Sequence, residues 1–226
     1  MRLNRHCPRN EGFTLMIVNL MALMVFLVWA GSTEAQVIYS DGTFNSEDWS
    51  LTIEVTSGNG GSGSGSQMVS GGSPGLYRSV THTMGSRPAQ LALFHRHLGS
   101  SFNPATQGSI TEINFQVDIK TFQDSGYGGQ SAAPVIRQDG IVFVGPFFSS
   151  SLSSWVHISR ANLVAADFTP VAGIFMPPPG TDHPNFSIDG STMDFGFLSS
   201  NSNPIDGIIG PSSTTVGYDN WSVAIT

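Results

Sequence analysis

The sequence predicts an all-β protein, an antiparallel β-sandwich or barrel, and two observations carry this prediction. After residue 35 the chain runs in short segments of alternating apolar and polar residues, separated by Gly, Pro, Ser and Asn, as strands and turns do. None of these segments keeps the 3.6-residue period of a helix for more than two turns. The length of 226 residues suits one such domain behind a leader.

The clearest predicted strand covers residues 113–121. One face is apolar and the other polar along its whole length: Ile113, Phe115, Val117 and Ile119 against Asn114, Gln116, Asp118 and Lys120. A hairpin is predicted around Asp139-Gly140, because residues 135–137 and 141–144 flank a turn pair in which glycine accepts positive φ. Residues 141–144 are apolar on both faces, which indicates a central strand.

Two further strands carry tryptophans. In residues 155–160 we expect Val156 and Ile158 to face the core, which leaves Trp155 and His157 outward. Near the C-terminus the apolar residues of 221–225 share one face, and we expect Trp221 and Trp49 to be core residues.

Residues 57–75 contain eight glycines and six serines. This composition predicts a long mobile loop between the first and second strands. The prolines at 177–179 predict a second, semi-rigid loop.

The N-terminus predicts a cleavable signal helix over residues 1–35. Arg2, Arg5 and Arg9 precede an apolar run over residues 13–30, and small residues follow before Gln36. An uncleaved membrane anchor is the alternative, because about 18 apolar residues can span a bilayer. Residues 36–226 would then be a secreted, extracellular domain without cysteine, since Cys7 leaves with the leader.

The charge balance argues against nucleic acid as a partner. From residue 36 onward six basic residues stand against fourteen acidic ones, a balance of −8. Nucleic-acid binding needs clustered lysine and arginine to displace counterions.

Three motifs show a family resemblance: residues 44–49 (FNSEDW), 71–78 (GGSPGLYR) and 217–223 (GYDNWSV). With them the chain resembles secreted jelly-roll domains of the galactose-binding-like kind, which include carbohydrate-binding modules and laminin-type globular modules. The resemblance implies an antiparallel jelly-roll β-sandwich, and often a structural calcium. The matching positions for calcium here would be Asp41 and Asp219. The alternative is that Asp219 and Asn220 only shape the turn into the last strand.

The predicted ligand-binding residues lie on two neighbouring segments. Trp155 would stack on the apolar face of a sugar ring. Polar side chains beside it would hydrogen-bond the sugar hydroxyls: His157, Asn114, Gln116 and Asp118. The alternative is an ordinary solvated strand face. Tyr127, among glycines, is a weaker candidate for a loop contact.

The sequence supports two other chemistries less well. His95 and His97 stand two residues apart and could chelate a metal from one strand face, although a polar edge-strand face explains them equally well. Catalysis has little support, because no nucleophile elbow, zinc motif or carboxylate pair stands out. We therefore predict a secreted, non-catalytic module that binds a polysaccharide or cell-surface glycan. The alternatives are a structural or adhesive protein without a sugar site, and a hydrolase in which Glu112, Asp118 and a histidine converge.

Overall fold

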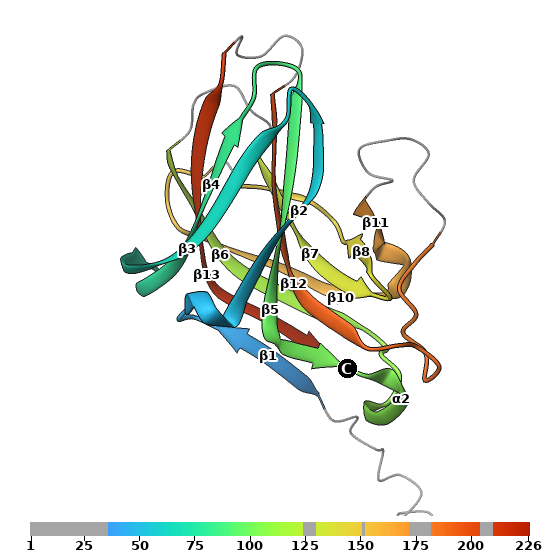
Figure 1. Cartoon of the computed structure of the whole chain (residues 1–226). Coiled ribbons are helices and arrows are strands. Elements are labelled where there is room, and N and C mark those ends of the chain that lie inside the picture. The colour runs from blue at the N-terminus through green and yellow to red at the C-terminus, as the bar shows by residue number, and fades with distance from the viewer. Residues whose placement is uncertain (1–35, 124–129, 151, 172–181, 204–209) are drawn as a thin grey trace, which may run out of the picture. The chain divides into compact units, whose positions relative to one another are not determined.

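The computed structural model describes residues 36–123, 130–150, 152–171, 182–203 and 210–226. These residues form two antiparallel sheets packed face to face (Figure 1). Sheet A has the order β10-β6-β13-β4-β3, with β1 paired to β13, and sheet B has the order β11-β8-β7-β12-β5-β2, with β9 paired to β7. The predicted all-β, antiparallel jelly-roll sandwich is confirmed.

The strands, in chain order, are β1 (Val37–Asp41), β2 (Trp49–Gly58), β3 (Gly61–Gly72), β4 (Gly75–Met84), β5 (Ala89–Phe102), β6 (Ile113–Gln123), β7 (Ser131–Gln138), β8 (Ile141–Val144), β9 (Phe148–Ser149), β10 (Val156–Leu163), β11 (Thr169–Pro170), β12 (Met193–Asn203) and β13 (Ser212–Ile225). Short helical turns connect some of them: η1 (Ser46–Asp48), α2 (Pro104–Gln107) and η2 (Ala165–Asp167).

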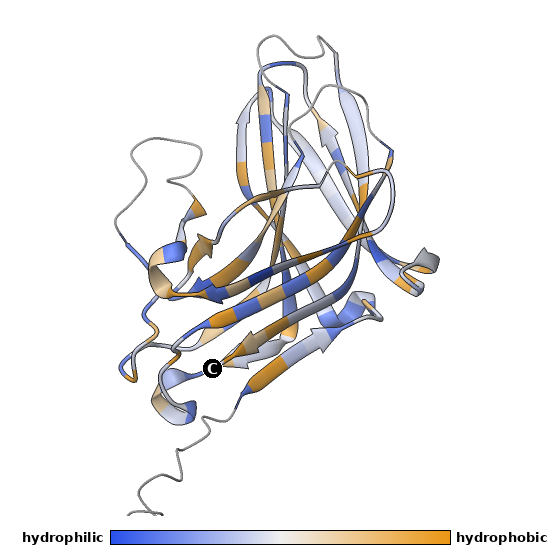
Figure 2. Cartoon of the chain, turned by 180° about the vertical axis from the view of Figure 1, so that it is seen from behind, coloured by the Kyte–Doolittle hydropathy of each residue, from blue (hydrophilic) through white to orange (hydrophobic). Residues whose placement is uncertain are grey.

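The core between the sheets follows from the alternation of side chains along the strands, which Figure 2 shows as alternating orange and blue bands. The four predicted apolar residues of β6 are all buried, as are Trp49 and Trp221, whose rings meet edge to face with centroids 5.2 Å apart. Both tryptophans are therefore core residues, as predicted. The outer face of sheet B carries a second buried apolar cluster that includes Phe94 and Leu198.

The predicted hairpin is β7–β8. Asp139 and Gly140 take φ angles of 53° and 81°, so both turn residues are left-handed, as a two-residue hairpin of this kind requires. β8 pairs with β7 on one side and with the two-residue β11 on the other. It is thus flanked on both sides, as its apolar sequence predicted.

The glycine-serine segment contradicts our prediction. Residues 61–72 are not a loop but the strand β3, at the edge of sheet A. The serines at 62, 64 and 66 are exposed, and the alternating glycines face sheet B. A Cβ on Gly63 would lie 2.2 Å from Leu93 Cδ1, and one on Gly65 would lie 2.9 Å from His95 Cε1, both on β5 of sheet B. Glycine is used here because the two sheets come too close for a side chain.

Part of the interior is polar. Arg78 and His82 of β4 and His95 of β5 are each at most 2% exposed. Near them the Tyr218 hydroxyl donates to Ser199 Oγ at 2.7 Å. This polar region lies between β4 and β13 of sheet A and β5 and β12 of sheet B.

Some sequence predictions concern residues outside the described ranges. These are the signal helix over residues 1–35, Tyr127 and the proline loop at 177–179. In the ranges that the structure describes, no helix has the length and apolar character needed to cross a membrane.

Candidate functional site

The outer face of sheet A brings four of the five predicted ligand residues together. On β6, Asp118 and Gln116 point away from the core, because their neighbours Val117 and Phe115 are buried. Across the β10–β6 pairing, His157 lies opposite Asp118 and Ser159 lies opposite Gln116. Trp155 precedes β10 by one residue and shares the direction of His157.

Asp118 is the centre of a hydrogen-bonded network on this face. Its Oδ1 lies 2.8 Å from His157 Nδ1, and its Oδ2 accepts from Asn220 Nδ2 at 2.9 Å. The same Asn220 amide donates to the backbone oxygen of Ser73 at 2.6 Å. Asn220 has a φ of 49° at a bulge in β13, which brings its side chain toward Asp118. The network thus ties β6, β10 and β13 to the β3–β4 turn.

Beside this network lies an aromatic platform, made of Tyr77, Phe122 and Trp155. Tyr77 and Phe122 stack with centroids 5.0 Å apart and 14° between their planes. Trp155 meets both rings edge to face, at 5.5 Å and 5.9 Å. Tyr77 is buried, whereas Phe122 is 41% exposed and Trp155 is partly exposed. The platform therefore has a buried base and a solvent-facing rim.

Gly217 of β13 is the floor of the platform. A Cβ at this position would lie 2.6 Å from Phe122 Cε2 and 2.8 Å from Trp155 Cη2, so the rings rest directly on the backbone. Trp155 is fixed further by its indole Nε1, which donates to the Gly71 backbone oxygen at 2.9 Å. Lys120 places its Nζ 4.6 Å from the centroid of the Phe122 ring. A tryptophan held by contacts with β3, β4, β6 and β13 is preorganised for a flat ligand.

Two residues of β6 and β10 differ from the prediction in their contacts or exposure. The side chain of Asn114 is engaged, since its Oδ1 accepts from the Asn162 backbone N–H at 2.9 Å where β10 bulges. Val156 was predicted to be buried but is 36% exposed, because it begins the edge strand β10. Ile158 does pack against the core.

The two predicted calcium ligands are surrounded by hydrogen-bond donors. Asp41 Oδ1 accepts from Thr43 and from the Phe44 N–H, and Oδ2 accepts from Trp49 Nε1 at 2.7 Å. Burial opposes ionisation of Asp41, but these hydrogen bonds outweigh it and lower its pKa. Asp219 accepts from the backbone N–H groups of Ser73 and Asn220, and burial raises its pKa.

Calcium prefers six to eight oxygen ligands, whereas N–H and O–H groups already occupy these carboxylates. Calcium binding at Asp41 and Asp219 stays a prediction, which the melting temperature can test. A comparison of melting temperatures in calcium and in EDTA tests it. A linking calcium ion would be lost to EDTA, and the melting temperature would fall. An equal melting temperature in the two buffers would contradict the prediction.

His95 and His97 do not lie on an edge strand. β5 runs between β12 and β2, and both imidazoles face the sandwich interior. His95 stacks on Phe197 at 4.7 Å, and His97 contacts Trp49 and Trp221 at 5.1 and 5.3 Å. Over the described ranges, no three histidine, cysteine, aspartate or glutamate side chains gather so that they could hold a metal.

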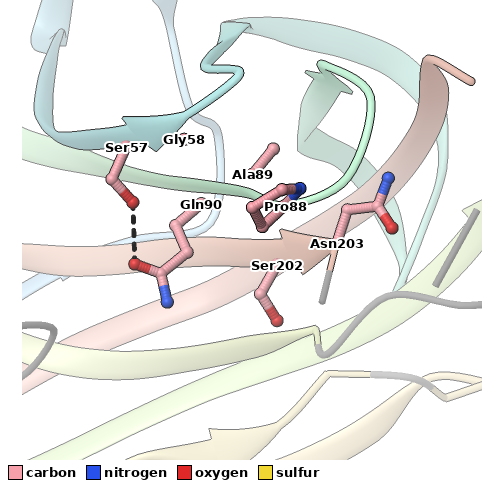
Figure 3. A pocket seen from close by; sticks show the side chains of 7 residues that line it. All are labelled: Ser57, Gly58, Pro88, Ala89, Gln90, Ser202 and Asn203. Atoms are coloured by element: carbon pink, nitrogen blue, oxygen red, sulfur yellow. Dashed lines mark hydrogen bonds between the residues drawn. The ribbon is translucent and has the colours of Figure 1, made fainter. Parts of the chain in front are cut away.

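A cavity that the sequence did not indicate lies on the outer face of sheet B (Figure 3). Its volume is about 330 Å³, and the lining includes Ser57, Gln90 and Ser202 from β2, β5 and β12. These three align because Ser57 pairs with Gln90 and Gln90 pairs with Ser202. The Ser57 hydroxyl donates to Gln90 Oε1 at 2.9 Å. None of the described lining residues carries a charge.

The geometry speaks against Glu112 and Asp118 as the two carboxyl groups of a hydrolase. Asp118 pairs with His157, but Glu112 lies six residues earlier, where β6 begins. Six residues of extended strand span about 20 Å, whereas glycosidases hold their two carboxyl groups about 5 to 9.5 Å apart.

Fold and surface together define an all-β sandwich with an exposed aromatic and polar face. Several solved structures of similar fold are β-sandwich carbohydrate-binding modules. A family 11 module from Clostridium thermocellum, in complex with a mixed-linkage β-1,3-1,4 tetrasaccharide, has a TM-score of 0.47 and 13% identity, over 85% of this chain and 96% of that chain. The CBM22-1 xylan-binding domain from Paenibacillus barcinonensis has a TM-score of 0.45 and 9% identity, over 86% of this chain and 97% of that one.

No family model matches the chain, and no curated protein matches it in sequence. At 9% and 13% sequence identity, the likeness to these structures concerns the fold alone.

Proposed function

We propose that the protein is a secreted, non-catalytic module that binds a polysaccharide or cell-surface glycan on the outer face of sheet A. The observation that carries the proposal is the fixed, partly exposed indole of Trp155 beside the Asp118–His157 pair. An aromatic ring stacks on the apolar face of a pyranose, and neighbouring polar groups hydrogen-bond its hydroxyls. Asp118, His157 and the exposed Gln116 supply such groups within one strand pair.

Secretion belongs to the same proposal and rests on the basic, apolar and small-residue pattern of residues 1–35. The non-catalytic role is supported by the distance between Glu112 and Asp118 along β6. The negative balance of the residues after 35 favours an uncharged glycan over a polyanion.

We expect Trp155→Ala to weaken glycan binding by roughly 5- to 150-fold, because a planar base stacked on one aromatic ring contributes about 1–3 kcal/mol and the apolar face of a sugar ring stacks on the same kind of surface. The measurement is affinity electrophoresis and calorimetry against a panel of polysaccharides that includes mixed-linkage glucan and xylan. Ile38→Ala is the matched control, since Ile38 is 59% exposed on β1 of the same sheet and lies outside the aromatic platform.

Equal binding by the wild type and Trp155→Ala would contradict the site. Failure of the wild type to bind any glycan in the panel would contradict the function, and would favour the structural or adhesive alternative. A Ser202→Ala variant tests whether the glycan binds in the cavity on sheet B instead of on sheet A. A loss of binding in this variant but not in Trp155→Ala would place the glycan in the cavity.

A further inference from the structure

The outer face of sheet A continues beyond the aromatic platform as a surface of hydroxyl groups, which we call the hydroxyl face. It lies on β3, β4 and β13, which are neighbours in the sheet (Figure 1). Over residues 62–66, 79–83 and 213–215 every second residue is buried or is an inward-facing glycine, and every residue between them is a serine or threonine that is at least partly exposed. Besides the exposed serines of β3, these are Ser79, Thr81, Thr83, Ser213 and Thr215.

The pairing of the strands sets these hydroxyls in rows across the sheet. Thr81 is paired with Ser64 on one side and with Thr215 on the other. The Oγ1 atoms of Thr81 and Thr215 lie 3.1 Å apart and share a hydrogen bond, so both side chains point to the same side of the sheet. Neighbouring strands lie about 4.8 Å apart, and successive outward residues of one strand lie about 6.8 Å apart. The hydroxyls therefore form a regular array in two dimensions.

The hydroxyl face meets the aromatic platform at Gly217. Ser79 is paired with Gly217, on which the rings of Phe122 and Trp155 rest. From Gly217 back to Ser213, β13 covers about 14 Å, which is longer than one sugar ring. A sugar chain that stacks on Trp155 and continues along β4 and β13 therefore passes over the hydroxyl face.

The chemistry of the hydroxyl face matches a neutral chain of sugars. No outward residue of 62–66, 79–83 or 213–215 is charged. A serine or threonine hydroxyl donates and accepts, and it rotates to suit its partner, as the hydroxyls of a sugar do. The core of a protein–protein interface is apolar and aromatic, and nucleic-acid binding needs clustered basic residues. The hydroxyl face offers neither.

We propose that the hydroxyl face binds the continuation of the polysaccharide that stacks on Trp155, so that the protein prefers long neutral glycan chains to short oligosaccharides. This inference rests on the proposed glycan-binding function and adds a preference for chain length to it. Each hydroxyl exchanges a hydrogen bond with water for one with the sugar, so its net contribution is modest. Only several of them together tighten binding appreciably.

The test is calorimetry with xylan and mixed-linkage glucan oligosaccharides, from disaccharide to hexasaccharide. We expect the wild type to bind the hexasaccharide at least about tenfold more tightly than the disaccharide, because each additional hydrogen bond contributes roughly 2- to 10-fold. The double variant Thr81→Val/Thr215→Val should lose roughly 5- to 100-fold in affinity for the hexasaccharide and keep its affinity for the disaccharide. The fold should tolerate this change, because valine replaces both partners of one hydrogen bond with apolar groups of the same shape.

Thr106→Val is the matched control and should leave both affinities unchanged, since Thr106 is an exposed threonine of α2, outside both sheets. If the double variant does not fold, Ser79→Ala takes its place and should weaken binding of the hexasaccharide more than that of the disaccharide.

The inference and the proposed function fail in different ways. If the wild type binds disaccharide and hexasaccharide equally well, or if the double variant weakens both alike, the inference is overturned and the proposed function stands. If the wild type binds no oligosaccharide of either series, both are overturned. A wild type that dimerises in light scattering, beside a monomeric double variant, would assign the hydroxyl face to a second copy of the chain and would also overturn the inference.

Discussion

Lowering the pH from 7 to about 4.5 is expected to reduce the free energy of unfolding by about 2–3 kcal/mol through His82 alone. Burial lowers the pKa of His82 to about 4, and burial together with the Arg78 charge holds the pKa of His95 well below its usual value. The unfolded chain takes up a proton on each histidine near pH 6.5, whereas the folded chain resists protonation. Stability is therefore fully present above pH 6.5 and is lost as the pH falls toward 4.

Urea unfolding at pH 7, 5.5 and 4.5 measures this loss. His82→Gln should flatten the pH dependence, because glutamine does not titrate. Two carboxylates also contribute to the pH dependence of the free energy of unfolding. Asp219 opposes the loss of stability on acidification, because its raised pKa favours protonation in the folded state. Asp41, with its lowered pKa, adds to the loss only in more acidic solution. A flat profile for the wild type would show that the buried histidines are not held neutral.

Gly63→Val is expected to destabilise the fold by about 3 kcal/mol, because added methyl groups in a filled core force neighbours out of place. A Cβ on Gly63 would lie 2.2 Å and 2.7 Å from the two methyl carbons of Leu93, which is fully buried. Either β3 moves away from sheet B or Leu93 leaves its rotamer. The measurement is urea unfolding of the purified variant.

Ser64→Val is the matched control, because its side chain points outward from the same strand. We expect its stability to equal that of the wild type or to exceed it slightly, since valine favours strands. Leu93→Ala in the Gly63→Val background should recover part of the loss, and the double-mutant cycle gives the coupling between the two positions. Equal destabilisation by Gly63→Val and Ser64→Val would show that β3 does not pack as described.

The parts of the fold that the sequence predicted are those in which the pattern is local. β6 alternates over nine residues, and Asp139-Gly140 fixes its hairpin by backbone conformation alone. β3 was missed because alternating glycine and serine resembles a flexible linker in composition. Its inward-facing glycines contact Leu93 and His95 of sheet B, which each lie 30 residues away from the glycine that faces them. Only the packing of the opposite sheet identifies these glycines as inward-facing residues.

The candidate site was predictable to the same extent. The alternation along their own segments predicts that Trp155, His157 and Asp118 face outward, and the β10–β6 pairing places the two segments side by side. Phe122, Tyr77 and Gly217 complete the platform from three different strands, so no local pattern marked them. The row of Ser57, Gln90 and Ser202 depends on pairings between residues 33 and 112 positions apart in the sequence. Arg78 and His82 were missed because polar residues in an alternating strand usually indicate the solvated face.

The edge position of β3 affects how molecules of this protein associate with one another. The Gln67 N–H points away from β4, toward Ser46 Oγ at 3.5 Å, and by the alternation of an antiparallel ladder the peptide groups of Gly61, Gly63 and Gly65 point the same way. From residue 55 to residue 77 the chain has no charged side chain. Edge strands usually carry lysine or proline to prevent another strand from pairing with them. The β3 edge along residues 61–66 is therefore open to sheet extension by a neighbouring molecule, and Ser64→Lys is a substitution that would protect concentrated solutions from self-association.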